Sequence, residues 1–157
     1  MNSKIARKMF VNTISQLIEK MIAWCPSQNV ELLRMQECFE TQKTVDQKEI
    51  FNAWKKFIVE PLNYASVINA RNDNIKYFLD TNFDDVVNSM VASEGGDDTI
   101  ITFVVNLIHS IQSCGRTLTL QQQNELLQMF KELDMFTVCI DPTIATAINA
   151  AMASTTA

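Results

Sequence analysis

The chain has 157 residues, of which 47% are hydrophobic and 20% charged, a balance typical of a globular protein rather than a disordered one. A chain of this length can bury about two-thirds of its surface in one core, so we expect a single domain over residues 1–152. Three glycines and three prolines are too few for the frequent turns of an all-β protein, which favours helices.

The net charge of −5 is unevenly distributed along the chain. Residues 1–60 carry a net charge of +2, and residues 61–157 carry −7. Because the acidic second half repels phosphate backbones, nucleic-acid binding would depend on the basic residues of the first half. Only Lys4, Arg7 and Lys8 cluster there, so the charge pattern argues against a general nucleic-acid-binding protein.

The four cysteines, Cys25, Cys38, Cys114 and Cys139, are widely spaced and form no CxxC pair. No secretory signal is recognisable after Met1, because polar residues interrupt the first apolar positions. We therefore expect reduced thiols and a cytoplasmic location. The most apolar stretch is shorter than the roughly 20 residues that cross a bilayer, so no membrane span is predicted.

Apolar residues recur at three- and four-residue intervals along most of the chain, the spacing of one helical face. The pattern predicts helices over residues 4–24, 30–39, 44–59, 61–70, a short stretch ending near 79, then 83–92, 98–114, 119–133 and 142–152. Apolar residues cover nearly the whole circumference of the helix at about 98–114. The fold class is therefore all-α, a single-domain bundle of about eight or nine short-to-medium helices around this central apolar helix.

Capping signals set several of these helix ends. Pro26 ends the first helix, and the Thr44 to Gln47 and Thr119 to Gln122 segments have the capping-box pattern. Asp141 and Pro142 are typical of an N-cap followed by proline at the first helical position. The apolar run Met135–Ile140 has no assignment from its pattern, and the tail 153–157 is expected to fray.

The single histidine, His109, lies midway along the predicted central helix. Its neighbours at helical spacing include no carboxylate, so a structural or interface role is favoured over general-base catalysis. A pairing of His109 with a cysteine of another segment stays open, although nothing in the local sequence supports it.

Metal and cofactor signatures are weak. Asp80, Asn82 and Asp84 occupy the first, third and fifth positions of a calcium loop, but Asp85 and Val91 stand where that loop needs Gly and Glu. A helix N-cap with acidic residues in its first turn is the simpler interpretation. The cysteines are too far apart for a typical zinc site, and nucleotide, hydrolase and zincin motifs are absent, so we predict no catalytic residues, no metal and no cofactor.

Eight methionines, two tryptophans and nine phenylalanines are more informative about contacts than about chemistry. Most of them fall on inward helical faces and are expected in the core. Trp24, Met129, Met135 and Phe136 lie off these faces, and we predict them as candidate interface residues.

These observations favour a non-enzymatic helical module that binds other protein chains, including copies of itself, as a structural or assembly component such as a viral structural protein. The first alternative is a helical enzyme or small-ligand-binding protein with a pocket between helices, using Asn106, His109 or a buried thiol. The second is a weak nucleic-acid binder that uses the N-terminal basic residues together with Lys55 and Lys56.

Overall fold

The computed structural model describes residues 2–43, 47–85, 88 and 99–155. Nearly all of these residues are helical and none of them is in a strand, which confirms the predicted all-α fold. The α-helices are α1 (Ser3–Trp24), α2 (Asn29–Gln42), α3 (Gln47–Trp54), α4 (Pro61–Arg71), α5 (Ile75–Asp80), α7 (Thr99–Gly115), α8 (Leu120–Ile140) and α9 (Thr143–Thr155). A 3-10 turn, η1 (Pro26–Gln28), precedes α2, and a π-helical turn, η2 (Lys55–Val59), follows α3.

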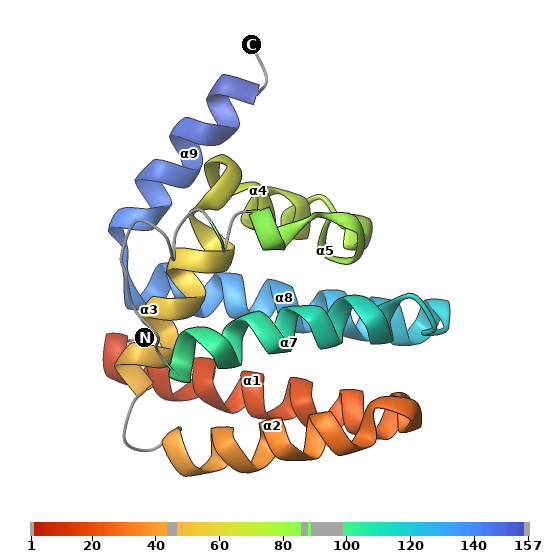
Figure 1. Cartoon of the computed structure of the whole chain (residues 1–157). Coiled ribbons are helices and arrows are strands. Elements are labelled where there is room, and N and C mark those ends of the chain that lie inside the picture. The colour runs from red at the N-terminus through yellow and green to blue at the C-terminus, as the bar shows by residue number, and fades with distance from the viewer. Residues whose placement is uncertain (1, 44–46, 86–87, 89–98, 156–157) are drawn as a thin grey trace.

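The helices pack in layers around α1 and α7 (Figure 1). One side of α1 contacts α8 and another contacts α2, while α7 contacts α1, α2, α3 and α5. The predicted central apolar helix is thus α7. A single hydrophobic cluster contains buried residues from each of the eight described α-helices, including the stacked pair Phe78 and Phe130, whose ring centroids are 4.0 Å apart.

Two helix starts show why local sequence specifies them. The Asn2 side chain accepts a hydrogen bond of 2.8 Å from the Ile5 N–H and caps α1. Thr119 and Gln122 form the predicted capping box at the start of α8, with reciprocal bonds of 3.2 and 3.0 Å. The predicted capping box at Thr44 lies outside the described residues, as does the predicted helix 83–92 beyond its first turn.

Helix α8 is longer than its pattern indicates. The predicted end near Leu133 is wrong, because the helix continues through the unassigned run Met135–Ile140. Phe136 and Thr137 extend the same buried face, so the helix continues as long as the core continues. The Asp141 side chain accepts a bond of 3.2 Å from the Thr143 N–H where α9 begins, and α9 then runs three residues past the predicted end at 152.

The predicted helix 44–59 does not keep one geometry. After α3 the backbone widens into the π-turn η2, and Pro61 then begins α4. At Leu62, Asn63 and Tyr64 the chain is left-handed, with φ values of 58°, 58° and 61°. Side chains with a Cβ atom make this conformation unfavourable by roughly 1–2 kcal/mol per residue, so the turn is held in place by the packing around it.

The Cys25 and Cys114 sulfurs form a disulfide, with Cα atoms 5.9 Å apart. The prediction that all four cysteines are reduced is therefore wrong for this pair, although Cys38 and Cys139 are free. The two residues are 89 positions apart, and only the packing of the end of α1 beside the end of α7 brings them together. Linear spacing, on which the prediction was based, carries no information about such a pair.

Candidate functional site

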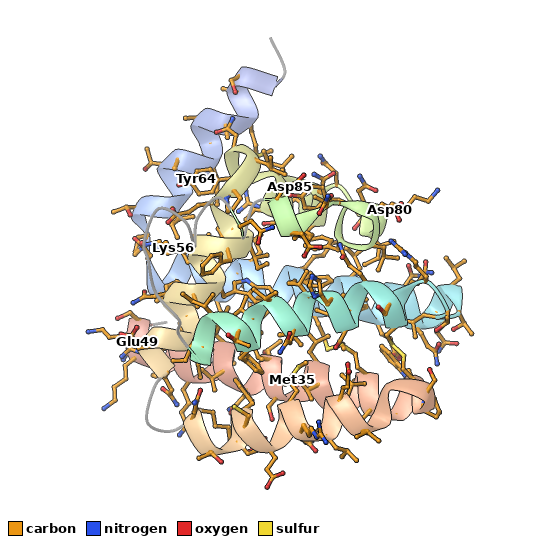
Figure 2. All side chains as sticks on the ribbon, viewed as in Figure 1. Met35, Glu49, Lys56, Tyr64, Asp80 and Asp85 are labelled. Atoms are coloured by element: carbon orange, nitrogen blue, oxygen red, sulfur yellow. A yellow bond between two sulfur atoms is a disulfide. The ribbon has the colours of Figure 1, made fainter. Side chains whose placement is uncertain are left out.

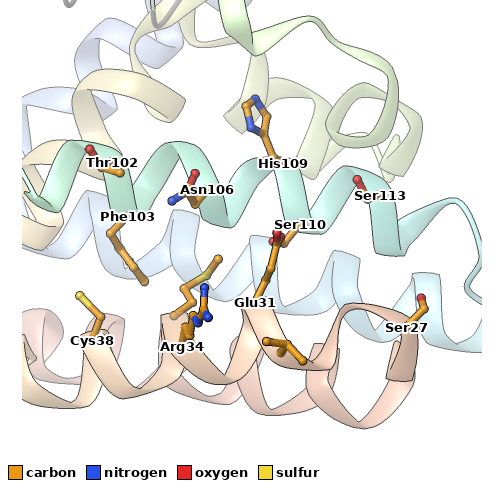
Figure 3. A pocket seen from close by; sticks show the side chains of 12 residues that line it. Ser27, Glu31, Arg34, Cys38, Thr102, Phe103, Asn106, His109, Ser110 and Ser113 are labelled. Carbon is orange, nitrogen blue, oxygen red and sulfur yellow. The ribbon is translucent and has the colours of Figure 1, made fainter.

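A groove with a volume of about 740 Å³ separates α2 from α7 (Figure 3). The two helices run antiparallel: Ser27 and Ser113 lie at one end of the groove, and Cys38 and Thr102 lie at the other. Twelve residues line it, namely Ser27, Val30, Glu31, Arg34, Met35, Cys38, Thr102, Phe103, Asn106, His109, Ser110 and Ser113. We call it the α2–α7 groove.

The α7 wall is a polar stripe on an otherwise apolar helix. Its residues follow one another at three- and four-residue spacing, which places them on one side of the helix: Thr102, Asn106, His109 or Ser110, and Ser113. The other sides of α7 supply core residues such as Leu107 and Ile111. Because the core needs only the apolar sides of α7, the polar stripe is left at the groove.

The α2 wall combines apolar and charged side chains. Val30 is 67% exposed, while Met35 projects from α2 toward α7 and is buried at the groove floor (Figure 2). Phe103 covers the floor from the opposite side and stacks on Phe39 with ring centroids 5.2 Å apart. The groove therefore has an apolar floor, with Arg34 and other polar groups above it.

The polar groups of the walls are not paired with one another. Within the described part of the chain, no side-chain hydrogen bond or ion pair involves Arg34, Asn106 or Ser110. Other helical hydroxyls are bonded to their own helix, as when Thr137 donates to the Leu133 carbonyl at 2.7 Å. Ser110 is only 6% exposed, so its unbonded hydroxyl lies at the base of the groove wall. These donors and acceptors are available to a bound molecule.

His109 meets a carboxylate that its own helix does not supply. Its Nε2 atom contacts the Asp84 carboxylate, which lies just beyond α5 in the chain. The neighbours of His109 at helical spacing do not include this partner, because the two residues are 25 positions apart in the sequence. The imidazole points away from α2 (Figure 3), and the described residues provide no hydrogen bond from it to a serine or cysteine. Among the described residues the imidazole is therefore paired with an acid and not with a nucleophilic side chain.

The same side of α7 holds the end of α5. The Gln112 side-chain amide donates to the carbonyls of Phe78 and Thr81, at 3.1 and 2.7 Å. Arg116 donates to the Leu79 carbonyl at 3.3 Å. These donors satisfy carbonyls that a helix leaves free at its C-terminus, so this side of α7 is firmly attached to α5.

The calcium-like pattern after α5 is a helix N-cap, as its departures from a calcium loop indicated. The Asn82 side-chain oxygen accepts from the Asp84 N–H at 3.1 Å, and its amide donates to Asp85 at 3.3 Å. Asp80 and Asp85 lie at the surface near the end of α5 (Figure 2). No cluster of three or more histidine, cysteine or acidic side chains suited to a metal ion occurs among the described residues.

The four predicted interface residues do not form one exposed surface. Met129 and Phe136 are buried in the core of this chain. Met135 is 51% exposed, and Trp24 is partly buried with the Lys20 ammonium 5.8 Å from its ring centroid. A role of these residues in binding stays a prediction. Trp24 and Met135 are the two whose side chains are at least partly exposed.

The groove itself was not predicted as a site. Asn106 and His109 were singled out on α7, but the α2 residues that face them were not. The spacing of polar residues on α7 was visible in the sequence, whereas the identity of the opposite wall depends on helix packing.

Comparison of the chain with models of protein families, with curated proteins and with solved structures found no match. Within the described residues, every helix is too short or too polar to cross a membrane.

Proposed function

We propose that this chain is a non-enzymatic helical module that binds a segment of another protein chain in the α2–α7 groove. The observation that carries the proposal is the combination of an apolar floor at Met35 and Phe103 with unpaired polar groups at Arg34, Asn106 and Ser110. A polypeptide supplies both kinds of partner, because its side chains fill apolar pockets and its backbone offers a donor and an acceptor at every residue.

The shape of the groove also favours a polypeptide. The stripe from Thr102 to Ser113 extends over twelve residues, or roughly 16 Å along the helix axis. This length matches three turns of a helix or a short extended segment. Both walls belong to helices that pack against the core, so the surface is formed before a partner arrives, which lowers the entropy cost of binding.

A small-molecule-binding protein is the second candidate. The volume of about 740 Å³ lies within the range of ligand pockets, and the groove contains Asn106 and the Cys38 thiol. The open length of the groove and the lack of a base bonded to Cys38 or Ser110 among the described residues favour a peptide over a reactive substrate.

Selection from a displayed peptide library on the immobilised chain tests the proposal. The dissociation constant of the strongest peptide is then measured by fluorescence anisotropy for the wild type and for two variants of the same helix. Val30→Glu places a charge and extra bulk in the groove, beside Arg34, and should weaken binding about tenfold or more. Leu33→Glu makes the same change at an exposed aliphatic residue outside the groove and should leave binding unchanged.

Two results would refute the proposal: the library yields no specific peptide, or the two variants bind the peptide equally. Light scattering coupled to size-exclusion chromatography shows whether the bound chain is a second copy, since self-association would raise the mass with concentration. The second candidate is tested by adding compounds of a small-molecule library to the labelled peptide complex and measuring its displacement by fluorescence anisotropy.

A further inference from the structure

The disulfide lies at one end of the α2–α7 groove. Ser27, which lines that end, follows Cys25 by two residues, and Ser113, which lines the opposite wall, directly precedes Cys114. The covalent bond therefore joins the two segments from which the walls of the groove extend. Both cysteines are almost fully buried, at 4% and 1% exposed.

Helix α2 is attached to the rest of the protein near both of its ends. At its C-terminal end, the Ser15 hydroxyl of α1 donates to the Glu40 carboxylate at 2.8 Å. At its N-terminal end, η1 connects it to Cys25 and so to the disulfide. Between these attachments, Leu32 and Phe39 pack into the core, while Arg34 faces the groove.

We infer that the Cys25–Cys114 disulfide is a redox-dependent clasp that sets the width of the α2–α7 groove and thereby its affinity for a bound segment. The inference rests on the proposed function for its effect on binding, but its effect on the position of α2 does not depend on any ligand.

Reduction removes the covalent restraint at this end of the groove. The two buried thiols are then held near each other only by the packing of the side chains around them.

On the α2 side, the least buried segment at this end is η1 with the first turn of α2. The end of α7 is bonded to α5 through Gln112 and Arg116, and Gly115 packs so closely on Leu79 that a Cβ atom there would clash with it. Helix α1 packs along α8. In contrast, η1 and the first turn of α2 carry exposed residues such as Ser27 and Val30. Without the disulfide, α2 would pivot about its Glu40 end.

The chemistry needs a dithiol reductant and proceeds by two thiol–disulfide exchanges. A thiolate of the reductant attacks one sulfur of the pair, which breaks the Cys25–Cys114 bond and forms a mixed disulfide. The second thiol of the reductant then attacks the mixed disulfide. Two protons pass from the reductant to Cys25 and Cys114, and the reductant leaves as its own disulfide. A small-molecule disulfide reverses the sequence.

Hydrogen exchange measured by mass spectrometry tests the clasp without any ligand. The protein is compared oxidised, reduced with dithiothreitol, and reoxidised, in a Cys139→Ala background that removes one free thiol. Amides of α2 should exchange about tenfold faster after reduction and recover on reoxidation, while those of α8 stay unchanged. Equal exchange of α2 in both states would overturn the inference. A loss of helicity throughout the chain would also overturn it, because the disulfide would then stabilise the whole fold and not the position of α2.

A second experiment measures the dissociation constant of the selected peptide for the same three samples. It also measures this constant for a Cys25→Ala, Cys114→Ala double variant. Affinity should fall about tenfold on reduction, return on reoxidation, and be equally low in the double variant. If the peptide binds all samples alike, the inference fails and the proposed function stands. If no peptide binds any sample while α2 still loosens on reduction, the proposed function fails and the clasp stands.

Discussion

The Lys55 ammonium lies 2.8 Å from the Asp141 carboxylate, although 86 residues separate the two in sequence. The pair joins the π-turn η2 to the junction of α8 and α9. Asp141 also accepts the Thr143 N–H, so one carboxylate both caps the last helix and holds the middle of the chain against it.

Replacing either partner should lower the free energy of unfolding, and a double-mutant cycle measures the pair. We expect a coupling of about 0.5–1 kcal/mol between Lys55→Met and Asp141→Asn, since both side chains keep some contact with water. Urea unfolding followed by circular dichroism provides the four values. Additive effects of the two substitutions would show that the contact contributes nothing to stability.

The Asp141 carboxylate makes the free energy of unfolding depend on pH. The hydrogen bond from Lys55, helped by Thr143, lowers the pKa of Asp141 in the folded protein. A lowered pKa means that the contribution is present above the ordinary carboxyl value of about 3.9 and is lost as pH falls through the folded pKa. The stability difference between wild type and Asp141→Asn should therefore shrink between about pH 5 and pH 2.

Two other carboxyl groups also make the free energy of unfolding depend on pH in the acid range. Lys43, together with Ser15, lowers the pKa of Glu40, which therefore loses its contribution in the same direction. Burial raises the pKa of Asp134, partly offset by Arg71, so its contribution is lost as pH rises through its folded pKa. Urea midpoints for the variant pair isolate Asp141 from both. A stability difference between wild type and Asp141→Asn that stays constant over the acid range would contradict the contribution of the ionised Asp141 carboxylate.

The left-handed turn at residues 62–64 provides a test of backbone conformation. Leu62 is 56% exposed and has a φ of 58°, a region that glycine occupies without cost. Leu62→Gly should therefore raise the free energy of unfolding by about 1 kcal/mol. Leu33 is similarly exposed but lies in the right-handed helix α2, so Leu33→Gly should lower it by about 1 kcal/mol. Equal destabilisation by both substitutions would show that the turn is not left-handed in solution.

The Tyr77 hydroxyl has no hydrogen-bond partner in the part of the chain that the structure describes. Its oxygen is buried and forms no hydrogen bond with any described residue, while its ring packs edge-on against Phe78 and Phe83. Burial raises the pKa of Tyr77 to about 12, because the phenolate would lose its hydration. Tyr77→Phe removes an unsatisfied group and keeps the ring contacts, so it should stabilise the protein by about 1 kcal/mol.

Thermal unfolding checks the sign of that change, and an absorbance titration checks the environment of the phenol. The step near pH 12 in the wild type should be missing in the variant. A variant that is less stable than the wild type would mean that the hydroxyl has a partner.

The helices themselves were predictable because their signals are local. The capping box of Thr119 and Gln122 acts over three residues, and the apolar spacing of α1 and α7 acts over one or two turns. Where local signals were weak the prediction was less accurate: α8 continued past Leu133, and the predicted helix 44–59 changed geometry at η2.

Short-range signals specify the helical class and most of the helix ends, since each depends on neighbours within a few positions. The same signals indicated an α7 that is apolar almost all round, whereas the structure places polar residues of α7 along the groove. Long-range packing brings Cys25 to Cys114 and His109 to Asp84, and it makes α2 the second wall of the groove. None of these contacts could be predicted, because helix formation is a short-range property of the chain. Which helices become neighbours is decided by the packing of side chains from distant segments, which no local spacing encodes.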